Sequence, residues 1–187
     1  MRRPMALVVA AATAVCLGGT VQGDERYPRT IVADAKVDSN GTTITSKVTI
    51  KIDRLMEPSR HTRVVDGLKY NGYQGFMNAL RPLPVIASIA TPNKQVDARY
   101  AWETKVDNRM RLIVVADTPL FFLPSDSAKA GYDLTVVELI LDDRGAGTGT
   151  IAGAARVKPA GDGVVLQDYA TAPVKLTIAS PAAKPKS

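Results

Sequence analysis

The sequence has 187 residues, a formal net charge of +6, one cysteine and one histidine. A chain of this length can form one domain that buries about 70% of its unfolded surface, so it can build a core without disulfides. Base-stacking aromatic residues are not interleaved with the basic ones, which excludes nucleic acid as a predicted partner.

The N-terminus has the three parts of a cleavable secretory signal peptide. Arg2 and Arg3 are basic, Met5–Leu17 is an uncharged run too short to span a bilayer as a helix, and Val21-Gln22-Gly23 supplies small residues for cleavage. We predict cleavage near Gly23, export to the periplasm or the extracellular space, and no transmembrane span in the mature chain. A twin-arginine signal and a lipoprotein signal at Cys16 are alternatives that the flanking residues fit less well.

Cleavage of this signal limits the available chemistry. The net charge falls from +6 to +4, because two arginines and no acid leave with residues 1–23. Cys16 leaves as well, so the mature chain has no thiol and one histidine, His61. We therefore predict no catalytic constellation, no metal site and no cofactor.

The first structural element is a β-hairpin. From Ile44 to Ile52 apolar and polar residues alternate with the period of a half-buried strand. Asn40-Gly41 precedes this strand and suits a two-residue type I′ turn. If these two residues form the loop, the paired residue numbers sum to 81 and the apolar residues share one face. The predicted pairs are Val37 with Ile44, Ala33 with Val48, and Ile31 with Ile50.

A basic stretch follows, from residue 51 to residue 69. We interpret Glu57–Gly67 as a connection, with a short strand at Arg63–Val65. The stretch is a candidate for contact with an anionic surface such as lipid head groups or polyanionic glycans. The residues that would make this contact are Lys51, Arg54, Arg60, Arg63 and Lys69.

One short helix is predicted at about 73–81. Tyr73, Phe76, Met77 and Leu80 have the i, i+3, i+4, i+7 spacing of one helical face. Pro82 and Pro84 end the helix.

The remainder of the chain has a β pattern. We predict strands at Val85–Ala90, Val96–Glu103, Leu112–Ala116, Thr118–Leu123, Leu134–Leu141, Ile151–Lys158, Val164–Asp168 and Val174–Ile178. In the second of these, Val96, Ala98, Tyr100 and Trp102 are expected to share one face. About nine short strands at this spacing favour an antiparallel β-sandwich or barrel, in a single domain at 24–179 with a flexible tail at 180–187.

Glu138 and the aromatic residues near the predicted helix are the candidate ligand-binding residues. Glu138 lies in the most apolar strand, so its carboxylate must face solvent or meet a base. The acids Glu103, Glu138 and Asp133 are also the candidates for a carboxylate pair of the kind that hydrolyses glycans. The full set of predicted ligand-binding residues is Tyr70, Tyr73, Phe76, Tyr100, Trp102 and Glu138.

These features favour a non-enzymatic, exported β domain that binds a partner or has an envelope-associated role. The predicted partner is a protein, a glycan or a small apolar ligand. Two alternatives stay open. One is a carboxylate-based hydrolase of extracellular or envelope glycans, and the other is a lipocalin-like carrier of an apolar ligand, which requires a closed barrel with a hollow interior.

Overall fold

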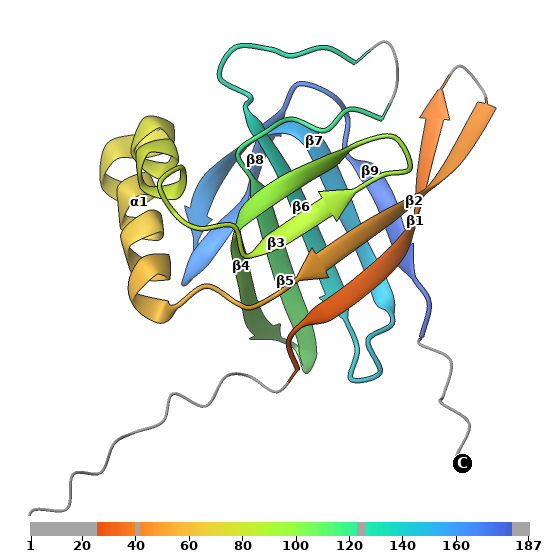
Figure 1. Cartoon of the computed structure of the whole chain (residues 1–187), viewed down its shortest axis with the longest axis horizontal. Helices are drawn as coiled ribbons and strands as arrows, with labels where there is room; N and C mark the ends of the chain where they lie inside the picture. Colours follow the sequence, from red (N-terminus) through yellow and green to blue (C-terminus); the bar gives the residue numbers. More distant parts are fainter. Residues whose placement is uncertain (1–25, 40–41, 123–125, 181–187) are drawn as a thin grey trace, which may run out of the picture.

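The structure, a computed structural model, describes residues 26–39, 42–122 and 126–180. Within them the chain forms nine strands and one helix (Figure 1). The elements are β1 (Arg29–Ser39), β2 (Thr42–Ile52), α1 (Pro58–Leu80), β3 (Ala87–Ala90), β4 (Gln95–Val106), β5 (Arg109–Ala116), β6 (Leu134–Leu141), β7 (Gly147–Ala160), β8 (Gly163–Tyr169) and β9 (Val174–Ile178). The predicted signal peptide, the Asn40-Gly41 turn and the tail from residue 181 lie outside the described residues.

Eight of the strands close into an antiparallel barrel. The ring runs from β1 through β6 in chain order, continues through β7 and β9, and closes on β1. Within the described residues β8 pairs only with the second half of β7, so it lies outside the ring. The predicted fold class is confirmed, and of its two forms the barrel is the one that the chain adopts.

The predicted hairpin register is also confirmed. β1 and β2 pair from Arg29 with Ile52 to Ser39 with Thr42, so that the paired numbers sum to 81 throughout. The turn between β4 and β5 is a tight two-residue turn, because Val106 pairs with Arg109 and both Asp107 and Asn108 have positive φ, 46° and 61°. Turn residues and apolar alternation therefore specify the pairing of neighbouring strands in these hairpins.

The helix is longer than predicted, and the expected connection and strand within Glu57–Gly67 are wrong. α1 begins at Pro58, which occupies the first helical turn, where its missing N–H costs nothing. It has non-helical angles at Gly72 (φ 62°, ψ −158°), which divide it into a longer arm from Pro58 and a shorter arm ending at Leu80. The predicted helix at 73–81 corresponds to the shorter arm.

The strand predicted at Thr118–Leu123 is wrong in its described part, residues 118–122. The backbone N–H of Leu120 donates to the carbonyl of Gly153 (2.8 Å), and the buried Thr135 hydroxyl donates to the carbonyl of Thr118 (2.7 Å). These bonds hold the segment as a connection across the end of β6 and β7. Its apolar residues are thus explained by packing rather than by strand pairing.

The barrel interior is filled by aliphatic side chains. Cross-strand partners share a face, so Glu103, Leu112, Leu139 and Gly149 lie on the inner side of their four strands. Ala101, Leu112, Leu139, Ile50 and Ile89 have no exposed area at all. Because a void large enough for water would give its lining residues accessible area, these side chains line no such void.

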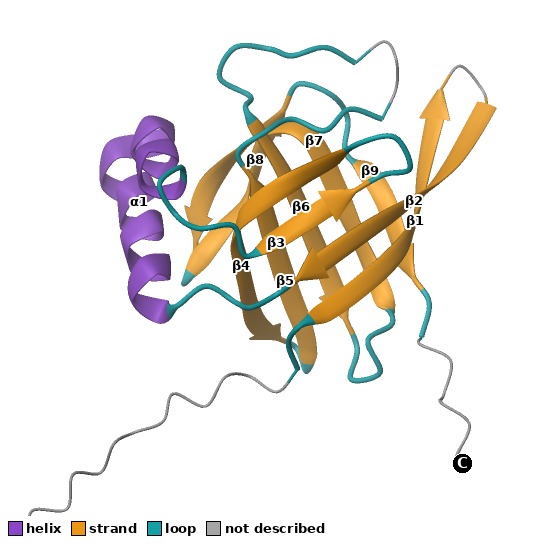
Figure 2. Cartoon of the chain, in the orientation of Figure 1, coloured by secondary structure: helices purple, strands orange, loops and turns teal. Residues whose placement is uncertain are grey.

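α1 lies outside the ring, against β4, β7 and β8 (Figure 2). Its buried face contacts the barrel through His61, Val64, Val65, Leu68, Phe76, Met77 and Leu80. Together with β8 it forms an outer layer over one side of the barrel wall. In the described ranges we find no helix with the length and apolar character needed to cross a membrane.

Candidate functional site

A β-bulge in β4 turns two aromatic side chains outward. Ala98 pairs with Ala116 and Tyr100 pairs with Val115, so Arg99 is an extra residue in the ladder. Ala98 faces the barrel interior, whereas Tyr100 and Trp102 face α1. The prediction that Val96, Ala98, Tyr100 and Trp102 share one face is therefore wrong, because the bulge reverses the alternation between Ala98 and Tyr100.

His61 of α1 stacks on the outward-facing Trp102. The two ring centroids are 3.6 Å apart and the ring planes differ by 9°. The imidazole is buried, with 5% of the residue exposed. Its Nδ1 lies 3.2 Å from the Tyr100 hydroxyl, and its Nε2 makes a short hydrogen bond with the backbone carbonyl of Asp162 in the β7–β8 turn. His61 thus joins α1, β4 and the β7–β8 turn.

These contacts fix the tautomer of His61. A carbonyl oxygen only accepts, so Nε2 carries the proton and Nδ1 accepts from Tyr100. Burial lowers the pKa of His61 below 6.5, and the opposing effect of the Asp162 carbonyl is smaller. Burial likewise raises the pKa of Tyr100, whose hydroxyl stays protonated. The imidazole is therefore neutral at pH 7 with both nitrogens engaged, which leaves no free lone pair for a general base.

Next to this stack is a cleft that opens to solvent between α1 and the β7–β8 turn. Its volume is about 260 Å³, just below the usual range of ligand pockets, which begins at about 300 Å³. We call it the α1–β4 cleft, and it is lined by Pro58, His61, Thr62, Val65, Asp66, Lys69, Trp102 and Asp162. Polar side chains thus border the His61–Trp102 stack.

The indole N–H of Trp102 is the most unusual group in this cleft. Nε1 is buried and donates to no acceptor within the described ranges. An enclosed donor of this kind costs about 1–3 kcal/mol unless a water or a ligand pairs with it. Trp102 is the only tryptophan of the sequence.

The Glu138 carboxylate, which the sequence predicts to face solvent or to meet a base, forms an ion pair with Arg111. Arg111 Nε donates to Glu138 Oε1 at 2.7 Å, and Arg111 Nη2 donates to the carbonyl of Val164 at 3.3 Å. Glu138 is on the outer face, since it pairs with Ile113, the partner of Trp102. The ion pair therefore fastens β8 to the barrel wall.

The three candidate acids do not form a cooperating pair. Glu103 lies on the inner face, where it accepts from the Tyr27 hydroxyl and pairs with Arg26 at 3.1 Å. Glu138 lies on the opposite face of the same wall. Asp133 is in the connection before β6, where its backbone N–H donates to the Tyr73 hydroxyl at 3.1 Å.

The other predicted aromatic residues do not converge on the cleft. Phe76 is fully buried in the core between α1 and the barrel. Tyr73 is half-buried, and the Arg156 guanidinium lies 4.8 Å from its ring centre. Tyr70 is 80% exposed on the outer side of α1. The structure therefore gathers Tyr100 and Trp102 and leaves Tyr70, Tyr73, Phe76 and Glu138 elsewhere.

Within the part of the chain that the structure describes, two of the five predicted basic residues have acidic partners. Lys51 pairs with Asp53 at 3.2 Å, and Arg60 pairs with Glu57 at 3.1 Å. Both pairs are exposed and contribute little to stability. Arg54, Arg63 and Lys69 are exposed on the connection before α1 and on α1 itself.

The glycine-rich turn after β6 is shaped by its own acid. Asp142 Oδ1 accepts from the backbone N–H groups of Arg144 and Ala146, each at 2.9 Å. This is the hydrogen-bonding pattern of an Asx turn. Over the described ranges, no three His, Cys, Asp or Glu side chains are placed to hold a metal ion.

Sequence reasoning missed His61 as a member of the site. Its signal was present, because His61, Val64, Val65 and Leu68 have the spacing of one helical face. The pattern becomes visible only when histidine is counted among the inward-facing residues and Pro58 is treated as a helix start.

Comparison with protein-family models gives no match, and comparison with curated proteins and with solved structures gives none. We therefore infer the function from the site.

Proposed function

We propose that this protein is a non-enzymatic, exported binding domain and that the α1–β4 cleft holds one sugar unit of an extracellular or envelope glycan. The observation that carries the proposal is Trp102, whose indole borders the cleft and whose N–H lacks a protein acceptor within the described ranges. A ligand oxygen that reached this N–H after a small movement of the cleft would satisfy it.

The chemistry of the cleft favours binding over hydrolysis. Both nitrogens of His61 are engaged, so the histidine cannot take a proton from water. Of the acids predicted from the sequence, Glu103 and Glu138 are on opposite faces of the barrel wall, so these two cannot supply the two carboxyl groups on either side of one bond that glycoside hydrolysis needs.

The cleft also favours a sugar over an apolar ligand. Its rim offers two carboxylates, an ammonium and a hydroxyl, which can pair with the hydroxyl groups of a sugar ring. An apolar ligand would instead need the barrel interior, which aliphatic side chains fill. The lipocalin-like alternative is therefore less well supported.

The export half of the proposal rests on residues 1–23. Expression in a bacterium, fractionation and N-terminal sequencing test it. The expected product is a periplasmic or secreted protein that begins at Asp24. An intact Met1 terminus in the cytoplasm would overturn export, and a diacylglyceryl mass on Cys16 would replace simple cleavage by lipidation.

Tryptophan fluorescence tests the binding half directly, because the one tryptophan borders the cleft. The full chain is titrated with N-acetylglucosamine, glucose and their oligomers, with heparin as a polyanionic comparison. We expect a saturable change in emission with at least one neutral sugar. Absence of a saturable change with every neutral probe would refute the proposed ligand class.

Cleft variants give the matched control. Asp66→Asn and Lys69→Met should each weaken binding about tenfold, which corresponds to the loss of one charge-assisted hydrogen bond. Asp97→Asn changes an exposed acid on β4, outside the cleft, and should leave binding unchanged. Equal affinities for all three variants and the parent chain would place the ligand elsewhere.

A further inference from the structure

A second depression lies across α1 from the α1–β4 cleft. It is formed where the chain reverses at Gly72 and the short arm of α1 crosses the long arm. The arms meet at Gly67 and Gly75 with backbone against backbone, since a Cβ on Gly75 would lie 2.3 Å from the Gly67 carbonyl oxygen. Glycine is therefore required at this crossing, and the floor of the depression is bare backbone.

This groove is wide, open and polar. Its volume is about 600 Å³. We call it the α1 groove, and it is lined by Arg63, Asp66, Gly67, Tyr70, Asn71, Gln74, Gly75, Asn78 and Ala79. Amide side chains predominate at its rim, and they both donate and accept hydrogen bonds, as sugar hydroxyl groups do.

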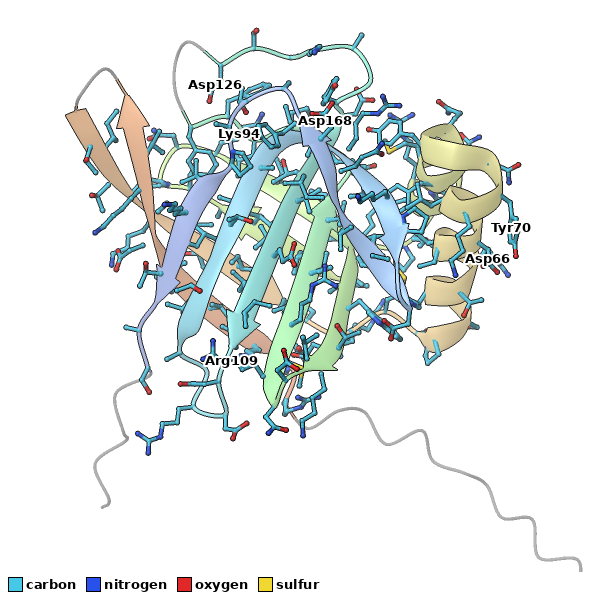
Figure 3. The ribbon with its side chains drawn as sticks, turned by 180° about the vertical axis from the view of Figure 1, so that it is seen from behind. Asp66, Tyr70, Lys94, Arg109, Asp126 and Asp168 are labelled. Carbon is cyan, nitrogen blue, oxygen red and sulfur yellow. The ribbon has the colours of Figure 1, made fainter. Side chains whose placement is uncertain are left out.

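Tyr70 is the exposed aromatic residue of the groove. It is the most exposed of the large hydrophobic residues that the structure describes, at 80%. Figure 3 shows Tyr70 and Asp66 on the side of α1 that faces away from the barrel. A tyrosine in this position adds nothing to the core, so the packing of the fold does not explain it.

The groove and the cleft are continuous through one residue. Asp66 lines both of them, and it is four residues from Tyr70, so the two side chains are neighbours on the helix surface. A ligand that leaves the α1–β4 cleft over Asp66 therefore meets Tyr70 next.

We propose that the ligand is an extended, neutral glycan chain that occupies both depressions, with Tyr70 stacking on a sugar several units from the one at Trp102. This inference rests on the proposed function, because it extends the same ligand along the surface. The charges along the path are Asp66, Asp162, Arg63 and Lys69, two acids and two bases, which suit an uncharged chain better than a polyanion.

Affinity as a function of oligomer length tests the inference. Trp102 emission is measured for the full chain with the monosaccharide, disaccharide and hexasaccharide of N-acetylglucosamine or of glucose, whichever series binds. The hexasaccharide should bind about five- to tenfold more tightly than the disaccharide, and Tyr70→Ala should remove that difference. The control is Tyr169→Ala, which removes an exposed tyrosine on β8 outside both depressions and should change nothing.

The outcomes separate the two proposals. If short oligomers bind and Tyr70→Ala leaves the affinity for the hexasaccharide unchanged, the extended site is refuted and the cleft survives. If no neutral oligomer of any length changes the emission, the proposed function fails together with the inference. If heparin binds and competes at Tyr70, the ligand is a polyanion and the neutral chain is refuted.

Discussion

The barrel interior and the outer layer of this protein differ in the polar groups that they hold. The interior is mainly aliphatic, with Ile50, Ile89, Leu112 and Leu139 fully enclosed, and its acid Glu103 pairs with Arg26. The outer layer, formed by α1, β8 and the outward face of β4 to β6, holds the His61–Trp102 stack and the Arg111–Glu138 pair. The difference indicates that the barrel supplies stability, whereas the outer layer supplies the groups that can recognise a ligand.

The largest loss of stability should come from a cavity made inside the barrel. Leu139→Ala removes a fully enclosed side chain and should lower the free energy of unfolding by about 2–5 kcal/mol, measured by urea denaturation. Folded molecules of this variant should still bind sugar with the parent affinity. A cost below about 1 kcal/mol would mean that the interior is loosely packed and that the comparison is wrong.

Gly72→Ala should cause a smaller loss of stability. This variant tests whether α1 reverses direction at Gly72. A Cβ at Gly72 would touch nothing within 4 Å, so the effect is conformational. Its φ of 62° with ψ of −158° is a region that side chains avoid, at a cost of about 1–3 kcal/mol. Thermal unfolding measures this cost, and a variant as stable as the parent chain would show that α1 does not reverse at this residue.

Breaking the Arg111–Glu138 pair should lower the free energy of unfolding by less, about 1–2 kcal/mol. Arg111→Met leaves the Glu138 carboxylate partly enclosed without its cation. The double variant Arg111→Met, Glu138→Leu should recover part of the loss, since it removes the unpaired charge as well. Additive losses in a double-mutant cycle would show that the two side chains act independently.

The smallest effect is a dependence on pH. The folded-state pKa of His61 lies below 6.5, so the unfolded chain binds its proton first and stability should fall as pH decreases through 6.5. The chain has no other histidine, the side chain whose ordinary pKa lies in this range. His61→Gln should therefore flatten the profile between about pH 7.5 and pH 5.5. A parent chain whose stability rises as pH falls through this window would contradict the buried, neutral imidazole.

The sequence predicts the parts of this fold that depend on neighbouring residues. In β1 and β2 the turn residues and the apolar alternation each specify the same register, and Ile31 does pair with Ile50. β6 and β9 also have their predicted bounds, because continuous or alternating apolar runs identify them.

The sequence does not reveal the site, because the site depends on one local irregularity and one long-range contact. Alternation along β4 places Tyr100 and Trp102 on the face of Ala98, and only the extra residue Arg99 turns them outward. His61 reaches Trp102 across 41 residues of chain, and no local pattern specifies that contact. The presence of the aromatic residues was therefore predictable, whereas their grouping was not.

The indole N–H resonance of Trp102 tests the central claim most directly. The chain has one tryptophan, so a ¹H–¹⁵N spectrum contains one indole signal. During titration with the neutral oligosaccharide that binds best, this signal should shift saturably, together with the amides of Asp66 and Asp162, while the amides of Leu112 and Leu139 stay in place. Shifts of the interior amides with an unchanged indole signal would place the ligand inside the barrel and contradict the account.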